Sequence, residues 1–182
     1  TLAVYTSTQA HHTVQRSAGV LGIGRSKVRG VPTDEQLRMD ADALEAMMAA
    51  DVAKGIVPVA VVAATGTTNT GAIDPIRRCG EIAKKHGAWF HVDGAYGLPG
   101  ILDDRVSPLY DGLELADSAI TDPHKWLNVP TGVAATFVRD RSILYRAFTQ
   151  EHADYLEGAF SDDDVQVSLD SMGVPYFDFS VE

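Results

Sequence analysis

The sequence predicts an α/β domain built on a mainly parallel β-sheet with helices on both faces. Strand-like and helix-like segments alternate along the chain, which is the order found in such sheets. The run VPVAVVAA at 57–64 is rich in β-branched residues and is typical of a strand buried on both faces. A length of 182 residues, with 45% hydrophobic and 22% charged side chains, fits one globular domain.

Two short strands and a helix are expected at the start of the chain. Residues 1–5 (TLAVY) and 27–32 (KVRGVP) have the composition of strands. Between them, AHHTVQRSAGVLG at 10–22 predicts a helix that ends near Gly22 or Gly24.

A second helix follows Asp40, which is a good N-cap because its side chain can accept the free backbone N–H groups of a first turn. Gly55 supplies the C-terminal stop. The predicted apolar face of this helix, at helical spacing, consists of Leu44, Met47, Met48 and Val52.

The remaining elements continue the alternation. A strand at 56–64 leads to a helix for which Asp74 and Pro75 form a cap and first-turn pair, and which Gly87 ends. The inner side of this helix consists of Ile76, Cys79 and Ala83. Three more strands and a short helix are expected at 88–92, 117–121, 132–138 and 141–147.

Three polar loops each follow a predicted strand: TGTTNTG at 65–71, DGAYG at 93–97 and TDPHKW at 121–126. Ligands of open α/β sheets bind beyond the carboxyl ends of the strands. We therefore expect all three loops to open on the same crevice.

Charge and composition exclude several kinds of partner. A net charge of −10 argues against nucleic acid and anionic membranes, which attract basic surfaces. The longest apolar run is far too short to cross a bilayer. With Cys79 as the single cysteine, no disulfide within the chain is possible, and a reducing cytoplasm fits. No targeting segment is visible, and both ends have the character of cuts through a larger protein.

Asp93 and Lys125 are the residues best placed for chemistry. A carboxylate at the end of a buried strand either caps a helix or anchors a positive group such as a ring N–H. Lys125, between a histidine and Trp126, is either a solvated lysine or an amine nucleophile made reactive by partial desolvation. A carboxylate facing a ring nitrogen and a lysine forming an imine are together what pyridoxal 5'-phosphate (PLP) requires.

Other candidates remain open at this level. Thr67, Thr68 and Asn69 are either donors to a cofactor oxygen or ordinary turn residues, and His11 and His12 either cover an aromatic ring or are structural. The sequence contains no zinc spacing, no GxSxG elbow, and no GxGxxG at a helix start, so no metal site, serine hydrolase or dinucleotide fold is predicted.

Four motifs together resemble the PLP-dependent group II amino-acid decarboxylases, of the aromatic-L-amino-acid and glutamate decarboxylase type. They are AHHTVQRSAG, ATGTTNTGAIDPI, HVDGAYG and TDPHKWL, in the family's order and at compatible spacings. The resemblance implies the large domain of a fold-type I PLP enzyme, acting in amino-acid metabolism as a homodimer with its site at the subunit interface. It implies that residues 1–182 are the central part of that domain, without the N-terminal segment and the C-terminal small domain.

The resemblance also assigns roles to residues. Lys125 would form the internal aldimine, Asp93 would pair with the pyridine nitrogen, and His11 would stack on the ring and take part in catalysis. Thr68, Ala95, His124 and Asp122 would lie near the cofactor. In HADYLEG, within a mobile catalytic loop at about 148–164, Tyr155 would return a proton to Cα; related aldehyde synthases have phenylalanine there.

Three positions depart from the family pattern. Asp122 stands where the family often has Asn, which puts a negative charge near the expected phosphate. Gly94 replaces the commoner Ala and is expected to loosen its loop slightly. His12 replaces a small Ser, which leaves open whether His11 or His12 stacks on the cofactor.

The sequence thus predicts a PLP-dependent decarboxylase that converts an aromatic or related L-amino acid to its amine and CO₂ in the cytoplasm. An aldehyde synthase or aminotransferase of the same fold is the first alternative. A non-catalytic interaction subunit that keeps the fold is the second.

Overall fold

The computed structural model describes residues 1–148. The chain divides into two compact units, Thr1–Phe137 and Val138–Glu182, and nearly all described elements belong to the first. The predicted catalytic loop, including Tyr155, and the acidic SDDD segment at 161–164 lie outside the described residues.

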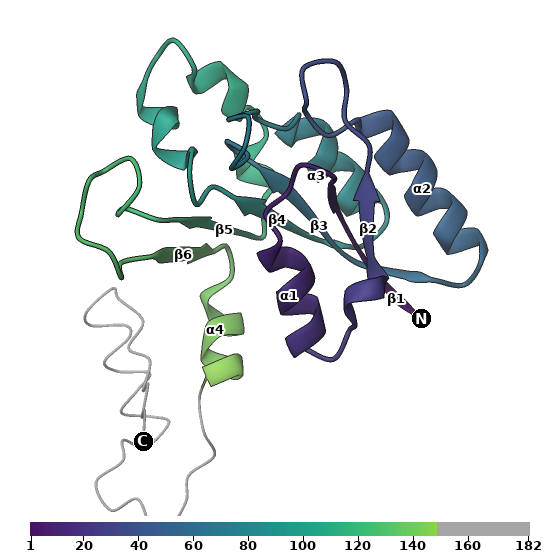
Figure 1. The fold of residues 1–182 in the computed structure, drawn as a ribbon. Coiled ribbons are helices and arrows are strands. Elements are labelled where there is room, and N and C mark those ends of the chain that lie inside the picture. The colour runs from purple at the N-terminus through teal and green to yellow at the C-terminus, as the bar shows by residue number, and fades with distance from the viewer. Residues whose placement is uncertain (149–182) are drawn as a thin grey trace, which may run out of the picture. The chain divides into compact units, whose positions relative to one another are not determined.

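The fold is a six-stranded sheet in the order β2-β1-β3-β4-β5-β6 (Figure 1). Parallel pairing joins β1 to β2, β1 to β3, β3 to β4 and β4 to β5, which confirms the predicted mainly parallel α/β fold. The strands are β1 (Leu2–Ser7), β2 (Val28–Val31), β3 (Val57–Ala64), β4 (Trp89–Asp93), β5 (Ser118–Thr121) and β6 (Ala135–Val138).

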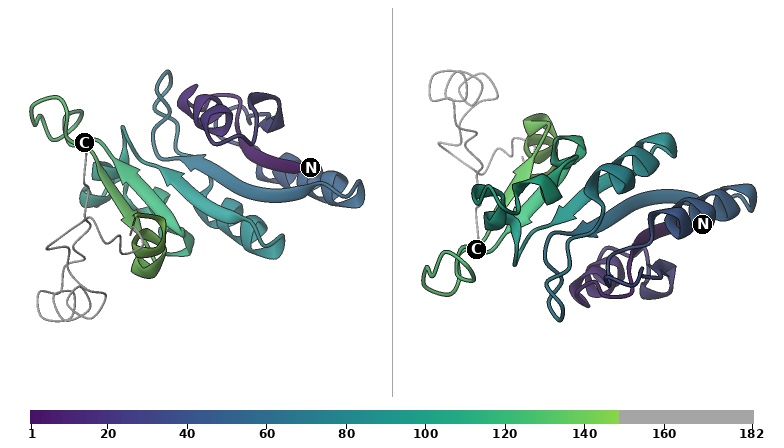
Figure 2. Two further views of the ribbon diagram at one scale, coloured as in Figure 1. Left: turned by 90° about the horizontal axis from the view of Figure 1, so that it is seen from below. Right: turned by 90° about the horizontal axis from the view of Figure 1, so that it is seen from above.

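Helices lie on both faces of this sheet. Figure 2 shows α1 on one face and α2 and α3 on the other. The α-helices are α1 (Thr13–Val20), α2 (Ala41–Ala53), α3 (Ile76–Lys85) and α4 (Arg141–Phe148), of which α4 belongs to the second unit. Short 3₁₀ helices are η1 (Arg25–Lys27), η2 (Leu98–Leu102), η3 (Ser107–Tyr110) and η4 (Leu113–Leu115).

The main core fills the layer between the sheet and the pair α2 and α3. It is built from alternate residues of the central strands together with the inner sides of both helices, and each large side chain fully buried there contributes about 1.5–3 kcal/mol. Its largest fully buried side chains include Tyr5, Val61, Phe90, Val92, Leu44, Met48 and Ile76.

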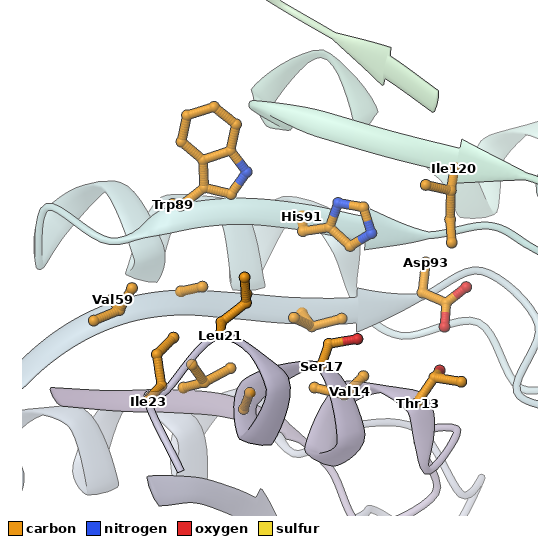
Figure 3. Close-up of a pocket in the computed structure, with 14 residues that line it drawn as sticks. Thr13, Val14, Ser17, Leu21, Ile23, Val59, Trp89, His91, Asp93 and Ile120 are labelled. Atoms are coloured by element: carbon orange, nitrogen blue, oxygen red, sulfur yellow. The ribbon is translucent and has the colours of Figure 1, made fainter. Parts of the chain in front are cut away.

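The described residues cover the opposite face of the sheet only in part. Here α1 and the strands enclose an apolar cavity of about 510 Å³ (Figure 3). Val59 and Val62 of β3 line it and are half-buried. The prediction that β3 is buried on both faces therefore holds for one face within the described residues.

The predicted face of α2 is wrong at one position. Leu44 and Met48 are fully buried, but Val52 is 47% exposed. Asp51 turns inward instead, where it accepts hydrogen bonds from Tyr5 Oη at 2.9 Å and Arg29 Nε at 3.0 Å. Burial opposes ionisation of this carboxyl, but those two hydrogen bonds outweigh it and lower the pKa of Asp51.

The two predicted N-caps have different outcomes. Asp40 caps α2 as expected, accepting the backbone N–H groups of Asp42 and Ala43 at 3.0 Å each. Asp74 does not cap α3, because Pro75 occupies the N-cap position. The Asp74 carboxylate accepts two N–H groups from other segments, as described below.

Candidate active site

The three polar loops do open on one crevice, as predicted. A cavity of about 350 Å³ lies beyond the carboxyl ends of β3, β4 and β5. Each loop contributes to its wall, together with the start of α1. The lining residues are His11, Thr13, Ser17, Ala64, Gly66, Thr67, Thr68, Asp93, Ala95, Tyr96, Ile120, Asp122 and Lys125.

Asp93 is the last residue of β4, and its side chain lines the cavity. Its Oδ1 accepts the backbone N–H of Ala95 at 3.1 Å, and its carbonyl accepts the N–H of Thr65 at 2.9 Å. The bond to Ala95 closes a local turn and is not a helix cap, because the next helix, η2, begins at Leu98. The turn therefore orients an acidic side chain into the cavity.

Lys125 reaches the same cavity from the loop after β5. Its Nζ lies 2.8 Å from Asp122 Oδ2, and its backbone N–H donates to the Asp122 carbonyl at 2.9 Å. The side chains are 37% and 19% exposed, so this is a partly shielded ion pair. The Trp126 ring packs edge-on against Tyr96, with centroids 5.7 Å apart, and stays half-exposed.

The loop after β3 brings hydroxyl groups to the cavity. Thr68 is exposed, whereas Thr67 is buried with its hydroxyl 2.6 Å from that of Thr70. Asp74 anchors this loop by accepting the N–H groups of Ala64 at 2.8 Å and Met39 at 2.7 Å. Burial raises the pKa of Asp74 to about 6, although both hydrogen bonds oppose the shift.

The histidines differ in position. His11 lines the cavity, with Nδ1 2.8 Å from the Thr13 hydroxyl. His12 packs on His11, with ring centroids 4.1 Å apart, and is not among the lining residues. His124 is also outside the lining, and its Nδ1 lies 2.9 Å from the Val133 carbonyl.

Four lining residues lie outside the three predicted loops and were not singled out from the sequence: Thr13, Ser17, Ala64 and Ile120. Thr13 and Ser17 are one helical turn apart on α1, so their hydroxyls share a face. That spacing, directly after a strand, is a signal that the sequence contains.

Gly94 does not loosen its loop, contrary to expectation. A Cβ atom at this position would lie 2.5 Å from Leu98 Cβ and 2.7 Å from the Ile120 carbonyl oxygen. The turn after Asp93 is therefore packed so closely against β5 and η2 that only glycine fits without a shift.

The part of the chain that the structure describes contains neither a metal-binding cluster nor a membrane-spanning helix. No group of three or more His, Cys, Asp or Glu side chains there is arranged to hold a metal ion. None of its helices has the length and apolar character needed to span a bilayer.

The donor set of the cavity fits PLP. Asp93 offers an acceptor for a ring N–H, Lys125 offers an amine for an aldehyde, and hydroxyl groups line the walls. Both key side chains belong to one cavity, so one small molecule can meet both.

Comparisons with known proteins agree. The chain is 39% identical over 155 residues to the aspartate 1-decarboxylase of Aliivibrio fischeri, covering 85% of this chain and 28% of that protein. It is 42% identical over 147 residues to the aromatic-L-amino-acid decarboxylase of Drosophila lebanonensis, covering 81% and 36%. The chain thus spans about a third of the length of these relatives.

Solved structures show the same fold. Oryza sativa TDC with PLP and tryptamine superposes with a TM-score of 0.82 at 31% identity, over 95% of this chain and 34% of that one. Rhodiola rosea 4-hydroxyphenylacetaldehyde synthase gives 0.78 at 29% identity, over 85% and 33%. These neighbours confirm the fold-type I architecture. The conserved domain of pyridoxal-dependent decarboxylases matches residues 1–176, and the chain belongs to that family.

Proposed function

We propose that the protein of which this chain is part is a PLP-dependent carboxy-lyase that converts an L-amino acid to its amine and CO₂. One observation carries the proposal: Asp93 and Lys125 line the same cavity at the carboxyl edge of a parallel sheet. Family membership supports it, because the relatives are decarboxylases of several amino acids.

The bound cofactor would supply an electron sink for the bond that breaks at Cα. Lys125 is the Schiff-base lysine of this proposal: its Nζ would hold the cofactor through the aldehyde group. Asp93 accepts the ring N–H and, as an anion, holds the proton on the ring nitrogen.

The other cavity residues position the cofactor in this proposal. His11, two residues before α1, would cover the ring and take part in catalysis, while Ala95 and Thr68 line the cavity around it. Asp122 and His124 flank the lysine, and their contacts to Lys125 and Val133 hold the loop in shape. Tyr155 returns the proton to Cα; this role rests on the sequence resemblance alone.

We propose an aromatic or related substrate. Tyr96 lines the cavity next to Asp93 and Lys125, and its ring is supported by Trp126. An aromatic wall packs well against an aromatic side chain. Assays with aromatic amino acids test this proposal against aspartate and cysteine sulfinic acid, for which two relatives are named.

We further propose a cytoplasmic homodimer with the site at the subunit interface, and that the chain is the central part of the large domain. Large apolar side chains next to the reactive lysine support an interface, since Trp126 and Leu127 are 51% and 52% exposed. The single cysteine, Cys79, is a buried free thiol, which suits a reducing compartment.

An aldehyde synthase is the alternative that a specific observation favours, because one of the structural neighbours is such an enzyme. Analysis of the products distinguishes the reactions: amine and CO₂ for a decarboxylase, aldehyde with peroxide for the synthase, and a keto acid for an aminotransferase. A non-catalytic subunit would form none of them.

The first experiment is spectral. Full-length protein mixed with PLP should develop the visible absorption band of a lysine-bound cofactor, and Lys125→Ala should abolish it. Lys84→Ala, on the exposed face of α3, serves as the matched control and should keep the band. A band that survives Lys125→Ala would reject the lysine assignment.

A further inference from the structure

Trp89, Ser118 and His91 form a hydrogen-bonded network between β4 and β5, next to Asp93. Trp89, His91 and Asp93 are alternate residues of β4, so their side chains point to the face of the sheet that carries α1 (Figure 3). The strand register places His91 opposite Ser118. The Ser118 hydroxyl oxygen lies 2.8 Å from Trp89 Nε1 and 2.7 Å from His91 Nδ1.

The chemistry of the three side chains determines which of them donates and which accepts in these hydrogen bonds. An indole N–H only donates, so Ser118 accepts from Trp89. The Ser118 O–H is then available to donate, and the unprotonated Nδ1 of a neutral imidazole is a suitable acceptor at this distance. In that arrangement the ring proton of His91 sits on Nε2.

The second nitrogen of His91 faces Asp93. In Figure 3 the Nδ1 edge of the ring turns toward β5, and Nε2 points along β4 toward the Asp93 side chain. Burial lowers the pKa of His91, which favours the neutral ring, and the negative charge of Asp93 opposes that shift. A neutral ring with an N–H directed at a carboxylate satisfies both influences.

We infer that His91 is a positioning residue for Asp93: with Nδ1 held by Ser118, it turns an Nε2–H toward the Asp93 carboxylate and reaches it through one water. The N–H stabilises the ionised carboxylate from the strand side, while the Ala95 N–H holds its other edge at the turn. Asp93 is thereby kept turned to the cavity. The inference rests on the proposed function in one respect, namely that Asp93 binds the cofactor.

A purely structural role would be different in kind. His91 would then join β4 to β5 through Ser118, and its loss would lower the stability of the sheet without changing Asp93. The two roles differ in the affinity of the site for PLP. Both require Ser118 to hold Nδ1, but only the positioning role also requires the proton on Nε2 to act on Asp93.

The first test reads the ring proton directly. Full-length protein without PLP, labelled with ¹⁵N-histidine, should show for His91 a protonated Nε2 and an unprotonated Nδ1 in long-range ¹H–¹⁵N spectra. The signal is assigned by its loss in His91→Phe. Ser118→Ala should shift the ring toward a mixture of tautomers. A wild-type His91 with its proton on Nδ1 would overturn the inference.

The second test measures PLP binding by equilibrium dialysis and visible absorption. His91→Phe keeps a ring in the cavity but removes the N–H, and should weaken PLP binding on the order of tenfold, as expected for loss of a hydrogen bond to a charged group. Val92→Ala is the matched control, because Val92 is a fully buried residue of the same strand that points to the opposite face. It should lower thermal stability and leave PLP affinity unchanged.

These outcomes separate the two claims. If His91→Phe binds PLP as tightly as wild type and with the same spectrum, His91 does not act on Asp93. If the wild-type protein binds no PLP, the proposed function fails, and the tautomer measurement still tests whether His91 carries the Nε2–H that the inference requires.

Discussion

Lys125 and Asp122 form an ion pair within a single turn of the loop after β5, with Nζ 2.8 Å from Oδ2. The lysine that we propose to bind the cofactor is therefore paired with a carboxylate three residues earlier in the chain. Asp122 also lines the cavity, which PLP, an anionic phosphate ester, would enter. If the proposed function is correct, Asp122 opposes cofactor capture in two ways.

Asp122→Asn should speed PLP capture by a few-fold. The substitution removes a partly exposed ion pair, a contribution of about 1 kcal/mol at most, and also removes a repulsive charge. Stopped-flow absorption of full-length protein mixed with PLP measures the rate. Asp104→Asn is the control: it removes the same negative charge at an exposed position and should leave the rate unchanged. A slower variant would show that Asp122 assists binding.

Gly94→Ala should destabilise the protein by about 1–3 kcal/mol, because the added Cβ would overlap Leu98 and the Ile120 carbonyl. Urea unfolding of the full-length protein measures the change. Gly19→Ala is the control: its Cβ would approach only the flexible Arg25 side chain, at 3.1 Å, within helix α1. Equal stability of Gly94→Ala and wild type would mean that the turn relaxes at no cost.

Asp74 should make stability fall as pH rises through its titration. Its pKa is about 6 when folded, against 3.8 for an ordinary aspartate, so the folded state binds the proton more tightly than the unfolded state. Its contribution to the unfolding free energy is largest below about pH 4 and is lost by about pH 7, a difference of roughly 3 kcal/mol.

The measurement compares wild type with Asp74→Asn, which cannot titrate. The stability of wild type minus that of the variant should decrease between about pH 4 and pH 7, as followed by urea unfolding. Other carboxyls change both proteins alike and cancel in the difference. A difference that rises over this range would place the folded pKa of Asp74 below its ordinary value.

Much of the fold could be predicted because strands and helix ends have local signals. The β-branched run of β3 and the N-cap at Asp40 need only neighbouring residues, and both are present in the structure. Asp74 was assigned wrongly because Asp–Pro before a helix resembles a cap. Its real partners, the N–H of Met39 in particular, are far along the chain and become neighbours only through the sheet topology.

The candidate site also has features that the sequence predicts and features that it does not. The three loops could be placed together because parallel strands bring their carboxyl ends to one edge. The ion pair of Lys125 with Asp122 and the close packing at Gly94 depend on side-chain geometry that no pattern states. Thr13 and Ser17 were missed because hydroxyls at helical spacing are common on solvent-facing helices.

Helix α2 provides the last prediction, since its sequence pattern and its packing disagree. Val52 continues the apolar spacing of Leu44 and Met48, but it is 47% exposed while those two are fully buried. Leu44→Ala should therefore cost about 2–5 kcal/mol of unfolding free energy, and Val52→Ala within about 0.5 kcal/mol. Urea unfolding of both full-length variants measures the contrast. Comparable losses in the two would mean that a segment outside the described residues covers Val52, and that the periodicity predicted its burial correctly.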